Sequence, residues 1–238
     1  MSTAIILRTP DRIPPFLEDH EIARVLELAQ TRWQQERRPC RRFQAHRDFV
    51  LLLTLFHTGM RIGEAIGLLW TDVDFVNHTV RVRTEKKRKA WRVVPVPAEW
   101  TSALLLYRHE GEAHIAGKHG GRVSRQCRIR RPFEMASRRA WARMHRLMTD
   151  AGIDRGRAHP HVWRHTYAVR AVRAGMPPMM LARLLGHSSP TVTMVYYHLL
   201  GTDVRPFVER MKVLQGWARS TATGRKRRAF DPTLALSP

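Results

Sequence analysis

Cysteine is scarce in this chain, and no apolar run near its start reaches membrane-spanning length. Only Cys40 and Cys127 occur among the 238 residues, and neither belongs to a CxxC motif. A disulfide framework is therefore not expected, and a reducing compartment fits. The apolar run at 4–7 follows no basic region and is too short for a signal peptide or a membrane span. These absences predict a cytoplasmic protein with no membrane partner.

Acidic residues are also scarce relative to basic ones. The chain has 42 Lys and Arg against 20 Asp and Glu, which gives a formal net charge of +22 at pH 7. This excess goes beyond what solubility needs and favours a phosphate polymer as the partner, because binding releases condensed counterions. RNA packing of the ribosomal type and a merely basic surface are the alternatives. With 43% hydrophobic residues, the chain has enough apolar material for the core of one large domain.

Hydrophobic periodicity predicts an α+β fold that is mostly α-helical, with one small antiparallel β-hairpin. Arg37–Arg42 is expected to be a connector, and Gly111–Arg131 the least structured stretch. The expected strands are Thr79–Arg83 and Trp91–Val96. The expected helices are Glu18–Gln30, Ala45–Thr58, Arg61–Leu69, Glu99–Arg108, Phe133–Asp150, Pro160–Ala174, Pro178–Leu185, a helix opened by Pro190, and Val204–Trp217. These elements predict an extended arm at 1–15, one domain at 16–217 and a basic, disordered tail at 218–238.

The first motif with chemical content is Thr58-Gly-Met-Arg61-Ile-Gly-Glu64. Arg61 is expected to begin a helix directly after a glycine turn, where free backbone N–H groups favour an anion. Glu64 lies three residues on, on the same face, where it could orient the guanidinium. The alternative is an ordinary surface Arg–Glu pair, which contributes little to stability.

The second motif is His161-x-x-Arg164, whose spacing places both side chains on one helical face. A histidine can donate to a phosphate oxygen, and an arginine gives a two-pronged contact that lysine cannot match. A solvated basic face or a zinc site are the alternatives, since His159 and His165 lie nearby. The group lacks the Glu of HExxH and any neighbouring cysteine, so no metal is expected.

The third motif is Leu184-Leu-Gly-His187-Ser-Ser, followed by Tyr196-Tyr197 on an apolar stretch. A tyrosine in such a stretch is usually part of a core or an interface. Ionising it at pH 7 costs roughly 4 kcal/mol, because its ordinary pKa is about 10. Two arginines and a phosphate-bound histidine could offset much of this cost, which makes a tyrosine nucleophile possible.

The tip of the expected hairpin carries Lys86, Lys87, Arg88 and Lys89. A lysine on a two-stranded ribbon could enter a DNA groove and protonate a leaving oxygen. A solvated run of charges that contacts backbone phosphate is the alternative for any one of these lysines.

These three motifs, in this order and at this spacing, resemble the catalytic domain of tyrosine recombinases, the phage integrase family. The resemblance covers about Pro15 to Leu214. It implies that Arg61 and Arg164 are the two catalytic arginines and that His161 is the histidine of the second box. It further implies that His187 contacts the phosphate and that Tyr196, rather than Tyr197, is the nucleophile.

The resemblance also implies a catalytic lysine on the hairpin. Lys86 shares strand parity with Val80 and Val82, which favours it, and Lys87 is nearly as good because the turn length is open. The implied reaction needs no metal, ATP or other cofactor. Tyrosine would attack phosphorus to form a 3′-phosphotyrosine, and the lysine would protonate the departing 5′-oxygen.

The implied partners are double-stranded DNA and further copies of the chain, as a tetramer on DNA. Family members commonly carry an N-terminal clamping domain, but only about 15 to 40 residues precede the pattern here. We therefore expect either a minimal recombinase or a partner that supplies the missing half, with the basic insert Gly117–Arg146 adding phosphate contacts. Val204–Trp217 is the candidate segment for exchange between copies, and packing of this helix on its own domain is the alternative. The alternatives are a non-catalytic DNA-binding regulator on this fold and a nicking-closing enzyme like type IB topoisomerases.

Overall fold

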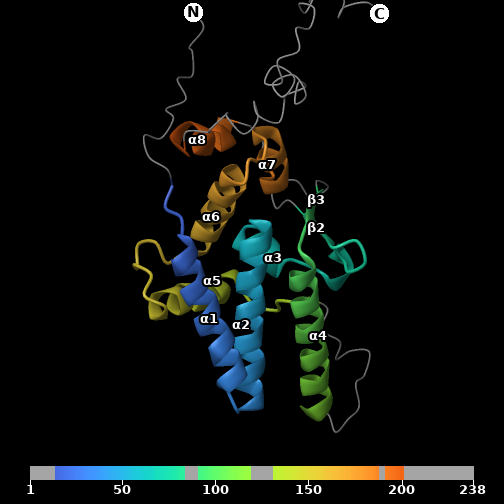
Figure 1. The fold of residues 1–238 in the computed structure, drawn as a ribbon. Helices are drawn as coiled ribbons and strands as arrows, with labels where there is room; N and C mark the ends of the chain where they lie inside the picture. Colours follow the sequence, from blue (N-terminus) through green and yellow to red (C-terminus); the bar gives the residue numbers. More distant parts are fainter. Residues whose placement is uncertain (1–13, 84–90, 119–130, 188–190, 201–238) are drawn as a thin grey trace, which may run out of the picture. The chain divides into compact units, whose positions relative to one another are not determined.

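The computed structural model describes residues 14–83, 91–118, 131–187 and 191–200. All of these residues lie in the first of two units into which the chain divides, residues 1–202. This unit is mostly helical and contains one three-stranded antiparallel sheet, so the expected α+β class is confirmed (Figure 1). Within the described ranges, no helix has the length and apolarity needed to cross a membrane.

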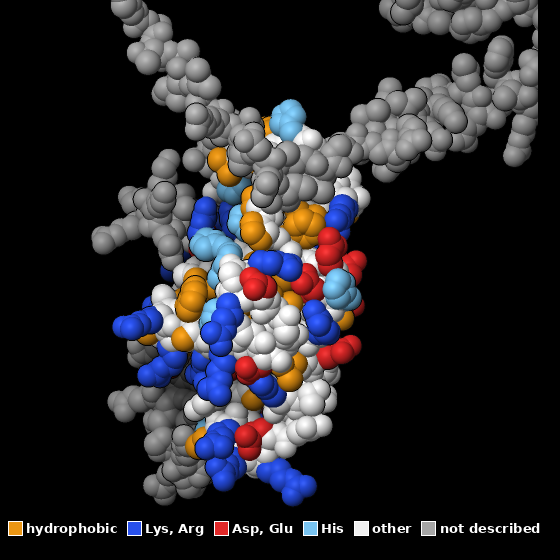
Figure 2. All heavy atoms as spheres, turned by 90° about the vertical axis from the view of Figure 1, so that its left-hand side faces the viewer, with side chains coloured by type: hydrophobic (Ala, Val, Ile, Leu, Met, Phe, Trp, Pro, Cys, Tyr) orange, Lys and Arg blue, Asp and Glu red, His pale blue; other side chains and the backbone are white. Residues whose placement is uncertain are grey.

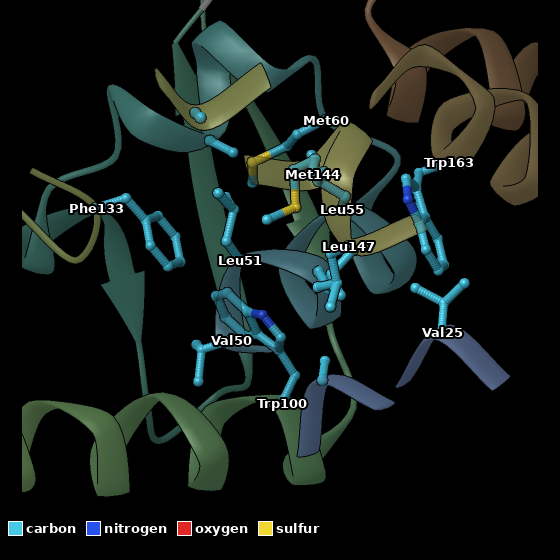
Figure 3. Close-up of a cluster of buried hydrophobic side chains, with 14 of the residues drawn as sticks. Val25, Val50, Leu51, Leu55, Met60, Trp100, Phe133, Met144, Leu147 and Trp163 are labelled. Atoms are coloured by element: carbon cyan, nitrogen blue, oxygen red, sulfur yellow. The ribbon is translucent and has the colours of Figure 1, made fainter. Parts of the chain in front are cut away.

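Helix α2, Pro39–Thr58, lies at the centre of the unit and packs against α1, Asp19–Gln35, α4, Ala98–Lys118, and α6, Pro160–Arg173 (Figure 1). Apolar residues recur along α2, and Val50, Leu51, Leu52 and Leu55 are fully buried. Figure 3 shows them against large side chains from other helices and a loop, and the labelled residues of this core are Val25, Val50, Leu51, Leu55, Met60, Trp100, Phe133, Met144, Leu147 and Trp163. This core fixes the end of α2, where the motif around Arg61 begins.

The sheet has the order β1-β2-β3, with β1 at Val73–Asp74, β2 at Thr79–Arg83 and β3 at Trp91–Pro95. The single turn η1, Trp70–Asp72, leads into it. β2 and β3 pair with Val80 opposite Val94 and Val82 opposite Arg92. Both valine positions on β2 are buried, as the period of two predicts. On β3 the same parity buries Arg92, a charged residue at a core position.

A second, smaller core lies among α6, α7, Pro178–Leu185, and α8, Thr191–Leu200. The chain turns sharply at the end of α2, before Arg61, and at the end of α7, before His187. Helix α3, Ile62–Ile66, starts directly after Arg61. Both α2 and α7 end on a glycine in the left-handed region, Gly59 with φ 60° and Gly186 with φ 67°. These glycines redirect the chain at the two places where the motif residues begin.

Several expected boundaries were wrong, and two of the errors fall at a proline and a glycine, residues that often interrupt helices. The sequence predicts Pro39 within a connector, but it is the first residue of α2, where its missing N–H costs nothing. The sequence predicts an irregular stretch from Gly111, but α4 continues through this residue to Lys118. Gly111 is buried, so packing of a small residue outweighs its weak helix propensity.

The remaining differences are smaller. Helix α1 runs five residues beyond the expected Gln30, α3 is shorter than the expected Arg61–Leu69, and α5 is Ser137–Asp150 rather than a helix from Phe133. Strand β1 was not expected. Lys86 and Lys87, most of the arm at 1–15 and the segment Val204–Trp217 with the tail lie outside the described residues.

Candidate active site

Arg61 is placed by the turn that ends α2. It is the N-cap of α3, and Glu64 one turn later binds it twice. The backbone N–H of Arg61 donates to Glu64 Oε2 at 2.9 Å, and its guanidinium Nη1 donates to Oε1 at 3.1 Å. The expectation that Glu64 orients Arg61 is confirmed. The Arg61 side chain remains 36% exposed, so its guanidinium has a fixed position and an open side.

Glu64 is almost completely buried and also binds a second arginine, Arg92 from β3. Burial raises the pKa of Glu64, but the hydrogen bonds and charge of Arg92 outweigh it and hold the pKa below its usual value. The carboxylate is therefore ionised at neutral pH and sits between two guanidinium groups.

Arg164, on α6, connects the ends of two other helices. It is buried, and its Nη1 donates to the carbonyl of Gly59 at 2.9 Å while Nη2 donates to that of Leu185 at 2.6 Å. Burial and the charge of Arg61 lower its pKa to about 10. The group stays protonated at pH 7, with two of its five N–H donors used by backbone carbonyls.

Two histidines lie beside these arginines. His161 is exposed at the start of α6, but part of its ring is covered by neighbouring atoms. This partial desolvation, followed by the charges of Arg164, His159 and Arg61, lowers its pKa. His187 follows the glycine that ends α7, and its Nδ1 lies 2.8 Å from the hydroxyl of Thr193. Burial, followed by the charges of Arg164 and Arg61, lowers the pKa of His187 to about 4. His187 is therefore neutral at pH 7 and can contribute a hydrogen bond but no charge.

The two adjacent tyrosines of α8 point to different partners. Tyr196 is buried in the second core, and its hydroxyl lies 2.6 Å from Nδ1 of His165. The charge of Arg164 acts on this phenol. The hydroxyl of Tyr197 instead donates to the carbonyl of Met176. Of the two tyrosines, Tyr196 is thus the one on which the charge of Arg164 acts.

The environment of Tyr196 differs from the expectation in one respect. The sequence argument expected the arginines to offset the cost of ionising it. In the structure, burial raises the pKa of Tyr196 to about 12 although Arg164 lowers it. Burial, followed by the charge of His161, lowers the pKa of His165 to about 4. The phenol keeps its proton at pH 7, and its hydroxyl is held against the ring of His165.

The structure therefore brings together Arg61, His161, Arg164, His187 and Tyr196, whose charges and hydroxyl act on one another. Lys86 and its alternative Lys87 are not among the described residues, but the strands that flank them are paired up to Arg83 and Trp91. In the part of the chain that the structure describes, no three His, Cys, Asp or Glu side chains are grouped to hold a metal ion.

Two neighbours of the site were missed from the sequence. His165 was considered only as a zinc ligand, yet it binds the hydroxyl of Tyr196. Arg92 was not considered at all. Its position on the inward parity of β3, shared with buried Val94, is a sequence signal that could have found it, because an arginine there must have buried partners.

Basic side chains extend beyond the site. Figure 2 shows Lys and Arg gathered over much of one face of the described unit. Helix α5 contributes the exposed residues Arg138, Arg139 and Arg146. Arg143 on the same helix is half-buried and paired with Asp48.

Comparison with known proteins gives consistent matches. The sequence profile of the phage integrase family matches residues 15–202. The protein y4gC of Sinorhizobium fredii is 29% identical over 194 residues, which cover 81% of this chain and 93% of that protein. Tyrosine recombinase XerC of Roseiflexus sp. is 28% identical over 187 residues, 79% of this chain but 56% of that recombinase. The chain thus spans about half the length of this second relative.

The fold is similar to that of solved recombinases. The crystal structure of the XerH site-specific recombinase, bound to its difH substrate in a pre-cleavage complex, superposes with a TM-score of 0.62 at 19% identity. The superposition covers 85% of this chain and 55% of that chain. At this identity the likeness concerns the fold.

Proposed function

This chain belongs to the phage integrase family, and on that premise we propose that it is a site-specific DNA recombinase. It cleaves and rejoins DNA strands through a 3′-phosphotyrosyl intermediate, with double-stranded DNA as its substrate. The observation that carries the proposal is the convergence of two arginines, two histidines and one tyrosine from α6, α8 and the chain segments that follow α2 and α7, where Arg164 bonds to the carbonyls of Gly59 and Leu185. The relatives named recombinase and the solved pre-cleavage complex of XerH support it.

Each side chain has a role that its environment supports. Arg61 offers an exposed guanidinium fixed by Glu64, and Arg164 a second positive charge, so both stabilise charge on the non-bridging oxygens of the phosphate. Neutral His187 and the exposed His161 add hydrogen bonds to the same oxygens. These interactions strengthen as charge develops in the transition state, which is what raises the rate.

The reaction makes one bond and breaks one. The Tyr196 oxygen bonds to phosphorus while its proton passes to solvent water, and the bond from phosphorus to the 5′-oxygen breaks. Lys86, or Lys87 as the alternative, gives the departing oxygen a proton. Attack by the 5′-hydroxyl of a second strand reverses these steps and restores the phenol, so the chain needs no metal, nucleotide or other cofactor for energy.

Before cleavage, the hydroxyl of Tyr196 must become accessible to the phosphate. The hydroxyl of Tyr196 is buried, bound to His165 and has a pKa of about 12. We infer that DNA binding changes the contacts of α8 and exposes the hydroxyl to the phosphate. We also propose that the chain acts as a tetramer on DNA in the cytoplasm, with a single domain at 16–217.

The buried phenol also favours one competing function, a DNA-binding regulator that never cleaves. A duplex with a nick next to the cleavage site separates the two, because the short strand leaves after cleavage and traps the covalent adduct. We expect an adduct from the natural chain and from Tyr197→Phe, and none from Tyr196→Phe. An adduct that disappears only in Tyr197→Phe would refute the choice of nucleophile. Salt-sensitive binding without any adduct would establish the regulator.

A further inference from the structure

Arg92 is a buried arginine whose guanidinium joins three elements around the site. Its side chain is 7% exposed. Nη1 and Nη2 donate to the two carboxylate oxygens of Glu64 at 3.1 and 2.8 Å, and Nε donates to the carbonyl of Leu184 at 2.6 Å. The residue lies on β3, its acceptors on α3 and α7, so one side chain fixes the sheet against both helices.

This geometry requires a planar guanidinium. Two parallel N–H bonds hold the carboxylate in one orientation, and a third bond on another edge reaches the backbone carbonyl. A lysine ammonium at this position keeps the charge but cannot make the paired contact and the third bond together.

The first group that Arg92 holds is Arg61, through Glu64. The carboxylate binds both arginines, and its Oε1 accepts from Arg61 Nη1 and from Arg92 Nη1. Without Arg92, the Glu64 carboxylate keeps only its two bonds to Arg61 itself, so no contact from the sheet fixes its orientation. The guanidinium of Arg61 is then held less firmly in its direction toward the open side of the site.

The second group is His187, through the end of α7. Arg92 donates to the carbonyl of Leu184 and Arg164 donates to that of Leu185, so two arginines hydrogen-bond to consecutive carbonyls. Gly186 follows, and a Cβ there would lie 2.9 Å from Nη1 of Arg92. The chain therefore passes directly against the guanidinium just before His187.

We propose that Arg92 is a positioning residue for strand cleavage, one that aligns Arg61 through Glu64 and His187 through the end of α7. The inference rests on the proposed recombinase function. Arg92 itself is too buried to reach DNA, so it acts on the rate of cleavage and leaves DNA binding nearly unchanged.

Arg157 provides a matched control. It also holds a glutamate with both terminal nitrogens, Glu21 at 2.9 and 2.7 Å, and a backbone carbonyl, that of Phe16 at 2.6 Å. These partners belong to α1 and the segment before it, outside the site residues. Arg157→Lys thus removes the same kind of contact without touching Arg61 or His187.

The test measures the single-turnover rate of adduct formation at saturating nicked DNA and the DNA concentration that gives half this rate. For Arg92→Lys we expect a rate at least about 30-fold lower and a half-saturating concentration within about threefold of the natural chain. Arg157→Lys should stay within about threefold in both. An unchanged rate in folded Arg92→Lys, or a change in half-saturation alone, would overturn the inference.

A second variant covers the case in which Arg92→Lys does not fold. The double variant Arg92→Gln with Glu64→Gln removes both buried charges together and leaves neither unpaired. We expect it to fold, bind DNA and cleave at least about 30-fold more slowly, and cleavage at the natural rate would overturn the inference. If the natural chain itself forms no adduct, the proposed function fails, which is distinct from an adduct that is insensitive to Arg92.

Discussion

At the scale of single residues, burial decides the state of each reactive group. Arg61 keeps an open side, whereas Arg164 and Tyr196 are buried. The pKa of Tyr196 is raised to about 12 because burial outweighs the charge of Arg164. In the proposed reaction, Tyr196 therefore needs a change of environment before it can attack, because Arg164 does not offset burial in this one.

Arg164→Lys tests the dual role of this side chain. A lysine cannot bind the carbonyls of Gly59 and Leu185 and a phosphate together. We expect unfolding free energy to fall by about 1–3 kcal/mol and the cleavage rate to fall at least about 100-fold, while DNA affinity changes little. Urea unfolding and adduct kinetics measure the two effects. A variant with natural cleavage would contradict the role given to Arg164.

Two half-buried histidines of the site, His165 and His187, predict how stability depends on pH. His165 and His187 have a pKa of about 4, lowered chiefly by burial, whereas an unfolded chain protonates histidine near pH 6.5. Between these values the unfolded state binds more protons, so the free energy of unfolding falls as pH drops from about 6.5 to about 4. Urea unfolding across this range should show the fall, and His165→Gln should make it shallower. An equal slope in that variant would contradict the burial of a neutral ring.

At the scale of elements, the sequence predicts helix ends and strands well where special residues mark them. Gly59 and Gly186 end helices as expected, and the strand Thr79–Arg83 has the expected bounds. The predictions at Pro39 and Gly111 were wrong because proline can begin a helix as well as break it, and a buried glycine can lie inside a helix. Packing against other elements decides which of these occurs. The site follows the same pattern, because its motif residues could be predicted from their spacing in the sequence. The contacts of Arg92 and His165 arise only when distant segments pack.

Gly59→Ala tests the turn that places Arg61. The position has φ 60°, and a Cβ would lie 2.7 Å from a ring carbon of Tyr167. Gly152→Ala is the control, since Gly152 has φ 81° but its nearest atom would be at 3.5 Å. The backbone conformation alone costs about 1–2 kcal/mol. Gly59→Ala should cost more than the control in urea unfolding, and only Gly59→Ala should slow cleavage. Equal effects would show that the close contact with Tyr167 is not important.

At the scale of the whole molecule, net charge is the feature that favours the proposed interaction with DNA. The chain carries a formal net charge of +22, Lys and Arg side chains are visible on the face in Figure 2, and the arginines Arg138, Arg139 and Arg146 of α5 are exposed. Each phosphate that such residues neutralise releases counterions, so affinity falls steeply with salt.

The salt dependence tests whether α5 contacts DNA. A double variant with Arg139→Gln and Arg146→Gln should weaken binding on all sequences and reduce the slope of log K against log [salt] by about 1–2. Its cleavage rate at saturating DNA should be unchanged. Titrations at several salt concentrations measure the slope, and an unaltered slope would place α5 away from the DNA.

In the proposed reaction, one tyrosine hydroxyl carries the DNA during strand exchange. Trapped adduct digested with nuclease and protease leaves a short nucleotide on one peptide, and fragmentation in a mass spectrometer identifies the modified residue. We predict a 3′-phosphonucleotide on Tyr196. The same modification on Tyr197, or on a serine or histidine, would contradict the account.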